Sequence, residues 1–181
     1  MKKLNILKEL LGTIKESMPV SEANDNNGPV NSELVNSMDY NAEEQAIRTL
    51  SIDFAKSLND RDFEFLDGRA EYHLYTVDHL IELIKSNDEQ TTADFLIENK
   101  LKVKYESCEF LSITFSENME QATVVYNVKT CVISAEKKYF KELNKKNNLK
   151  NEISKDTPFS TTYTLFVKKE KGTWKIDKFT I

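Results

Sequence analysis

The spacing of apolar residues along the chain changes once, after Lys100. Before Lys100, apolar residues recur at intervals of three and four positions, which is typical of amphipathic helices. From Leu101 to Ile181, apolar and polar residues alternate instead, as in strands that bury one face. Helices followed by a run of antiparallel strands predict an α+β domain. In this fold class the N-terminal helices pack in the concave face of a curved antiparallel sheet.

Capping residues divide the helical half of the domain. Asn41 and Glu44 have the spacing of a capping box and predict the start of the first helix. Thr76 predicts another cap, and Ser86 with Glu89 predicts a second capping box. The elements expected are helices at 41–59, 60–68, 77–84 and 87–97, with a short strand at 70–75. The helix after Thr76 carries its apolar stripe at Val77, Leu80, Ile81 and Ile84.

The strands of the C-terminal half are long and are separated by polar turns. Alternation in the first strand breaks between Ser107 and Phe110, so we expect a β-bulge that bends the strand. Turns are expected at 117–120 and 169–172, and the last strand at 174–179. The buried face is expected to hold Leu101, Val103, Tyr105, Leu111, Ile113, Phe115, Ala122, Val124, Tyr126, Val128, Val132, Phe159, Thr161, Tyr163, Leu165 and Val167.

The first 40 residues are expected to stand apart from this domain. Residues 1–18 predict an amphipathic helix, because Leu7, Leu11 and Ile14 share one face. That face buries against the chain's own domain, a partner helix or a membrane surface. Residues 19–40 are rich in Asn and contain two prolines, which predicts a flexible linker. The domain proper is then expected at 41–181.

Composition limits the class of partner. The chain has 181 residues and 39% hydrophobic content, which suits one domain with an appendage. A net charge of −5 excludes general nucleic-acid binding, which needs a basic surface. The segment at about 137–157 is nevertheless rich in lysine, and it is either a solvated loop or a partner-binding site. The lysines proposed to contact a partner are Lys137, Lys138, Lys141, Lys145 and Lys146.

No reactive motif is found in the sequence. His73 and His79 are the only histidines, and no metal, cofactor or catalytic residue is assigned. Cys108 and Cys131 are read as buried free thiols or, if the strands bring them face to face, as a disulfide. No apolar run is long enough for a transmembrane helix. The chain is therefore expected in the cytoplasm, or exported or membrane-associated if its native start lies elsewhere.

Two segments carry a resemblance to a known superfamily. They are the end of the first helix, FAKSLNDRD at 54–62, and the terminal strand, GTWKIDKF at 172–179. With this order of elements, about 140 residues of the chain resemble the NTF2-like (cystatin-like cone) superfamily. The chain departs from it in an insertion at 141–157 and a long N-terminal extension. The resemblance implies a cone-shaped fold and a homodimer.

Such cones serve as transport factors, isomerases, dehydratases and ligand-binding proteins, or as VirB8-like and TcpC-like assembly subunits of bacterial conjugation machines. Our first hypothesis is a non-enzymatic protein-interaction or assembly module of a bacterial mobile element or envelope system. The alternative is a small-molecule isomerase, dehydratase or passive carrier whose pocket holds some hundreds of cubic ångströms. The residues expected to line that pocket, unless they are ordinary core, are Phe54, Tyr105, Tyr126, Tyr163 and Trp174.

Overall fold

The computed structural model describes residues 36–66, 70–147 and 152–181. The expected helix at 1–18 and the linker up to residue 35 lie outside the described residues. The elements are α2 (Asn36–Asn59), the 3-10 helix η1 (Tyr72–Leu74), α3 (Val77–Ser86), α4 (Asp88–Asn99), β1 (Lys102–Phe115), β2 (Gln121–Ser134), α5 (Lys137–Asn147), β3 (Pro158–Glu170) and β4 (Thr173–Thr180).

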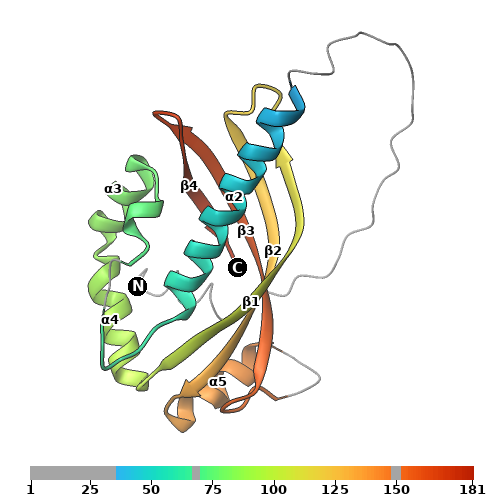
Figure 1. Cartoon of the computed structure of the whole chain (residues 1–181). Coiled ribbons are helices and arrows are strands. Elements are labelled where there is room, and N and C mark those ends of the chain that lie inside the picture. The colour runs from blue at the N-terminus through green and yellow to red at the C-terminus, as the bar shows by residue number, and fades with distance from the viewer. Residues whose placement is uncertain (1–35, 67–69, 148–151) are drawn as a thin grey trace.

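The expected α+β fold is confirmed. The four strands form one antiparallel sheet in the order β1-β2-β3-β4, which is the order expected of a meander. The sheet is strongly curved, and α2 crosses its concave face, while α3 and α4 lie beside α2 (Figure 1). Lys171 and Gly172 both have positive φ, 53° and 78°, which matches the tight hairpin turn expected before β4.

Two hydrophobic clusters hold the layers together. The larger one joins the inner face of the sheet to α2 through residues such as Ile47, Phe54 and Val124, which are fully buried. The smaller one lies where α4 and α5 meet the sheet and contains Leu96, Leu143 and Val132. Together the two clusters join every layer of the described part of the chain.

The expected bulge in β1 is confirmed, with one correction. The β1–β2 register shifts between Tyr105 and Ser107 and again between Phe110 and Ser112, so the strand bends twice along its middle. The second shift turns Leu111 to the outside, where it is 53% exposed, and Phe110 takes the inward place. The assignment of Leu111 to the buried face was therefore wrong, because it assumed unbroken alternation.

The helical half differs from expectation at several boundaries. Helix α2 begins at Asn36, so Asn41 lies inside the helix and is not its cap. Residues 60–66 form a turn rather than a helix, and the segment expected as a strand at 70–75 contains the 3-10 helix η1 (Tyr72–Leu74). The capping box at Ser86 is also wrong, because the chain turns at Asn87, whose φ is 56°, and α4 follows immediately. Thr76, by contrast, is the cap of α3.

The lysine-rich segment was expected to be a solvated loop or a partner-binding site. Its residues 137–147 form helix α5, so this part of it is not a loop. Tyr139 and Leu143, four positions apart, are buried against the sheet and α4. An Asn144 side-chain oxygen accepts from the Ile153 backbone N–H at 2.6 Å, and its amide donates to the Ile153 carbonyl at 2.8 Å. This pair of hydrogen bonds fixes the chain that leads into β3.

The two cysteines do not face each other. Cys108 pairs across the sheet with Val128 and packs on the inner core, whereas Cys131 pairs with Lys104. Both are free thiols, and Cys131 is buried. The free-thiol reading is thus the correct one. Among the described residues, no helix is long and apolar enough to cross a membrane.

Candidate functional site

The middle of the cone is filled with aromatic side chains. Phe54 from α2 makes edge contacts with Tyr75 and Phe179, at centroid distances of 5.8 and 5.0 Å. Tyr126 and Tyr163 lie 5.6 Å apart on neighbouring strands. Phe54, Tyr126 and Tyr163 are at most 1% exposed. The concave face of the sheet is therefore closed over its centre by ordinary core packing.

A small cavity remains beside this packing, between the end of α2, the start of α4 and the sheet. Its volume is about 60 Å³. A cavity must have a volume of about 10–15 Å³ for each water molecule that it holds, so this cavity has room for a few water molecules. Sites for metabolites and cofactors usually measure about 300–1,000 Å³. The residues that line the cavity include Asn59, Arg61, Glu71, Asp88, Thr130 and Tyr163.

The polar groups around the cavity bond to one another. Arg61 and Glu71 form a buried ion pair, with side chains 8% and 6% exposed. Burial raises the pKa of Glu71, although the Arg61 guanidinium opposes this effect, and burial also raises the pKa of Asp88. A buried ion pair of this kind is a structural feature unless a substrate reaches it. The small volume of the cavity leaves room for water rather than for a substrate.

The five aromatic residues expected to line a pocket do not surround one common cavity. Tyr163 lines the cavity, and Phe54 and Tyr126 lie in the closed centre of the cone. Tyr105 packs at the edge of that core from β1. Trp174 donates its indole N–H to the carboxylate of Glu43 and contacts the Phe115 ring at 6.0 Å. Contact of these residues with a ligand stays a prediction.

The most unusual surface feature lies on α3. Val77, Ile81 and Ile84 are 61%, 43% and 64% exposed, and they follow one another at i, i+4 and i+7 along one side of the helix. We call these three residues the α3 stripe. Leu83, on another side of α3, is 4% exposed and packs into the main core. No other described segment buries the α3 stripe.

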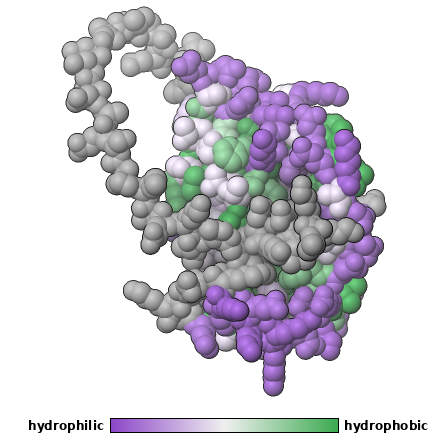
Figure 2. All heavy atoms as spheres, turned by 180° about the vertical axis from the view of Figure 1, so that it is seen from behind, coloured by the Kyte–Doolittle hydropathy of each residue, from purple (hydrophilic) through white to green (hydrophobic). Residues whose placement is uncertain are grey.

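The sequence analysis found the apolar residues Val77, Leu80, Ile81 and Ile84 but did not say which side of the helix faces the core. In the structure, Leu83 anchors α3 in the core. Five apolar residues in a ten-residue helix cover more than one face, and that excess was the available signal. A shallow groove of about 280 Å³ runs next to the stripe and includes Leu80 and Ile84. Hydrophobic surface also shows at the α3–α4 edge of the molecule, among hydrophilic surface, in the view from behind (Figure 2).

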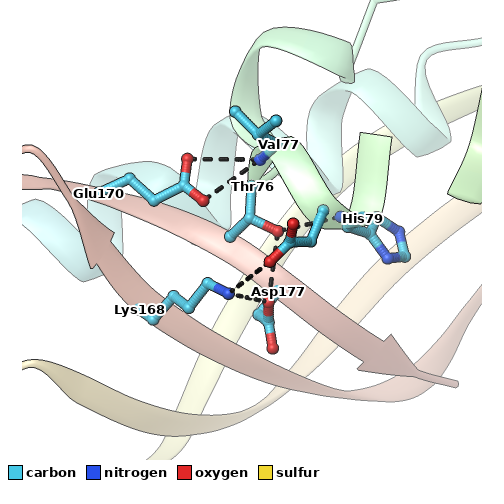
Figure 3. A network of polar contacts seen from close by, with 7 residues as sticks. Thr76, Val77, His79, Lys168, Glu170 and Asp177 are labelled. Atoms are coloured by element: carbon cyan, nitrogen blue, oxygen red, sulfur yellow. Dashed lines mark hydrogen bonds and ion pairs between the residues drawn. The ribbon is translucent and has the colours of Figure 1, made fainter. Parts of the chain in front are cut away.

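A polar network fixes the start of α3 against the sheet (Figure 3). The Thr76 hydroxyl accepts from the His79 backbone N–H at 3.2 Å and donates to the Asp177 carboxylate at 3.3 Å. Lys168 pairs with the same carboxylate at 2.8 Å. The Glu170 carboxylate accepts from the Val77 backbone N–H at 3.2 Å. Carboxylates and a capping hydroxyl satisfy the first backbone donors of the helix, so α3 is held firmly at this end.

His79 belongs to α3, and its side chain lies on the side of the helix that faces the core, away from the α3 stripe. Its ring packs against Tyr75, at a centroid distance of 4.5 Å, and against Phe179. Its Nε2 atom is buried and has no hydrogen-bond partner among the described residues. Burial lowers the pKa of His79, while the charges of Glu82 and Asp177 act in the opposite direction. A neutral imidazole among aromatic rings fits a packing role.

The lysines proposed to bind a partner lie on the outer side of α5. Lys137, Lys138, Lys141 and Lys145 are all exposed. Lys138 forms an ion pair with Glu98 of α4 at 2.7 Å, so one of these charges helps to hold α5 in place. The side chain of Lys146 lies outside the described residues, as do Leu7, Leu11 and Ile14. Partner binding at these positions stays a prediction.

Comparisons with known proteins add the following. No family model matches the sequence, and no curated protein sequence matches it. A conserved protein from Planctomyces limnophilus DSM 3776 has a similar solved structure, with 12% identity, a TM-score of 0.44 and coverage of 77% of this chain and 94% of that one. The intermembrane space region of the chloroplast protein ARC6 has 18% identity, a TM-score of 0.35 and coverage of 77% and 93%.

A third similar structure is a periplasmic fragment of TraM. It shares 6% identity with this chain, has a TM-score of 0.40, and the match covers 76% of this chain and 95% of the fragment. All three TM-scores lie below 0.5, so these likenesses do not assign a function to the chain.

Proposed function

We propose that the chain is a non-enzymatic protein-interaction or assembly module that binds an amphipathic helix of its partner at the α3 stripe. The exposure of Val77, Ile81 and Ile84 on a firmly held helix carries this proposal. An exposed row of aliphatic side chains is typical of a surface that a partner covers. Apolar residues at i, i+4 and i+7 suit a helical partner in particular, because a second helix presents the same spacing.

The exposed area of the stripe is large enough to contribute to binding. Full burial of one Val or Ile side chain stabilises by about 1.5–3 kcal/mol. About half of each side chain is still exposed, so covering the three together yields roughly 2–4 kcal/mol before the cost of association. This free energy is large enough for the three residues to act as anchors within a larger interface. The lysines of α5 are a second contact region in this proposal.

The setting that we propose is an assembly of a bacterial mobile element or envelope, as the superfamily resemblance implies. An exported or membrane-associated location and a homodimer belong to the same proposal. The alternative function, an isomerase, dehydratase or carrier, requires a pocket of several hundred cubic ångströms. The cavity inside the cone has about 60 Å³, so no observation favours that alternative.

The proposal is tested by quantitative affinity capture from cells of the organism that encodes the protein. The full chain is compared with the double variant Ile81→Glu/Ile84→Glu. The control is Leu111→Glu, which places the same charge at another exposed apolar residue, on the outer face of β1. We expect at least a tenfold loss of specific partners for the α3 variant alone, because losing two of the three anchors weakens binding by about 1.4 kcal/mol or more. Equal capture by all three proteins would rule out α3 as the partner surface.

A further inference from the structure

We infer that, in the isolated chain, residues 4–18 dock on the α3 stripe and must leave before a partner binds. This inference rests on the proposed function, since it names the resting occupant of the same surface. The structure supplies an apolar row on α3 that no other described segment covers. The sequence supplies a predicted amphipathic helix on the same chain. Spacing, reach and charge connect the two.

The spacing of the two apolar rows is the same. Leu7, Leu11 and Ile14 stand at i, i+4 and i+7, as do Val77, Ile81 and Ile84. Two helices with this repeat bury their apolar side chains against each other along a common seam. A free helix of about 15 residues is only marginally stable in water, so residues 4–18 gain helical structure by docking. The seam thus stabilises both partners.

The linker is long enough for docking within one chain. From Asn36 the chain runs about 10 Å along α2 to Glu43. Glu43 bonds to Lys169, and the adjacent Glu170 bonds to the first backbone N–H of α3. With the side chains of these contacts counted at full length, these steps place the start of α3 within roughly 40 Å of Asn36. Residues 19–35 span about 23 Å as a flexible chain and about 56 Å when extended, so α3 is within reach.

The charges of the two helices are of opposite sign. Residues 1–18 carry four lysines against two glutamates, a net charge of +2. Helix α3 carries Asp78, Glu82 and Lys85, a net charge of −1, at exposed positions. Surface charges of this kind contribute little energy individually, but they favour this pairing over the pairing of two copies of α3. The lysines of residues 1–18 that lie outside the seam therefore favour pairing with α3, whose net charge is negative.

Docking within the chain regulates access to the stripe. A tethered segment acts at a local concentration of about the millimolar range, so it competes with any free partner. The apparent affinity of the partner is then its affinity for the open stripe multiplied by the fraction of chains whose stripe is open. A partner that also binds residues 4–18 removes this competition. The N-terminal segment is then a built-in competitor for the assembly surface.

The inference is tested by hydrogen exchange on the full chain, read separately for residues 4–18 and for α3. We compare the wild type with Ile81→Glu/Ile84→Glu, with Leu7→Glu/Leu11→Glu and with the control Leu111→Glu. Each double variant should raise exchange about tenfold or more in the segment it does not touch. The N-terminal variant should speed exchange in α3, and the α3 variant should speed it in residues 4–18. The control should change neither.

Three outcomes would overturn the inference. Exchange of residues 4–18 in the wild type at the rate of a free peptide would show that they are not docked, because docking protects them. Protection that survives the α3 variant would place the docking site elsewhere. Protection of residues 4–18 that weakens when the protein is diluted would show that the α3 stripe is covered by the N-terminal segment of a second copy of the chain. Any of these results leaves the capture experiment unaffected, so a loss of partners for the α3 variant would still support the proposed function.

Discussion

The buried side chain of Asn59 provides a stringent test of how the cone is closed. Asn59 is the last residue of α2 and is 4% exposed. Its amide donates to the Ala55 carbonyl at 2.8 Å and to the Tyr163 hydroxyl at 3.2 Å, and its oxygen accepts from the Thr130 hydroxyl at 3.0 Å. One side chain thus joins the end of α2 to β2 and β3. Its replacement by alanine should loosen the closed centre.

The magnitude follows from the partners left behind. In Asn59→Ala the hydroxyls of Thr130 and Tyr163 both lose a buried partner, at a cost of about 1–3 kcal/mol each. The adjacent cavity admits water to the site, which places each cost near the lower end of that range. With the loss of the bond to Ala55, we expect about 3 kcal/mol of destabilisation. This corresponds to a fall in Tm of about 6–12 °C.

Urea unfolding followed by circular dichroism measures this free energy. The control is Asn127→Ala, because Asn127 accepts from the Thr162 hydroxyl at 2.8 Å in an exposed position. The same chemistry in water should cost at most about 0.5 kcal/mol. A loss below about 1 kcal/mol for Asn59→Ala would refute the reasoning, because it would mean that Asn59 does not join the helix to the sheet.

Three further predictions concern separate parts of the fold. Glu43→Gln should destabilise by about 1 kcal/mol in urea unfolding. The hydrogen bond from Lys169 lowers the pKa of Glu43 below 4.5, so this contribution is present above pH 4.5 and is lost as the pH falls through the folded-state pKa; an unchanged difference down to pH 3 would contradict it. For His79, burial lowers the pKa below 6.5, so the wild type should lose stability relative to His79→Gln as the pH falls below 6.5; parallel unfolding curves from pH 8 to 5 would exclude this. Leu143→Ala should cost about 2–5 kcal/mol by thermal melting because Leu143 is 1% exposed, whereas the exposed neighbour Lys141→Ala should change little; equal melting temperatures would show that α5 is not anchored by its core.

The sheet was predictable from sequence because successive side chains of a strand point to opposite faces, so apolar and polar residues alternate wherever one face is buried. Tyr126, Tyr163 and Ile176 face the core as that pattern requires. Where a bulge shifts the register, alternation no longer indicates the face, and Leu111 was misplaced for that reason. The bulge was expected from the break in alternation, but its position within one residue depends on the partner strand.

The helical half was harder to predict because capping motifs compete. Ser86 and Glu89 have the spacing of a capping box, yet Asn87 adopts the left-handed conformation and ends α3 first. Asn tolerates that conformation, so the turn does not need glycine. Helix α5 was missed because its composition is polar and lysine-rich. Only Tyr139, Phe140 and Leu143 indicate a buried side, and three residues in eleven are a weak signal.

The candidate site depended on tertiary packing that no local pattern contains. The aromatic residues were identified correctly as large and apolar, but their sequence positions do not say whether they surround a space or fill it. Likewise, the apolar stripe on α3 became informative only when Leu83 proved to be the residue that anchors the helix. A surplus of apolar residues on a short helix is the signal to look for in similar chains.

A crystal structure of the full chain, purified from its natural host, tests the central claim most directly. The density inside the cone is the quantity to examine, in the cavity beside Asn59 and Tyr163. We predict at most a few ordered waters there and a centre closed by Phe54 and Tyr126. An organic molecule bound inside an opened cone would contradict the account, because the interior and not the outer surface would then be the functional part.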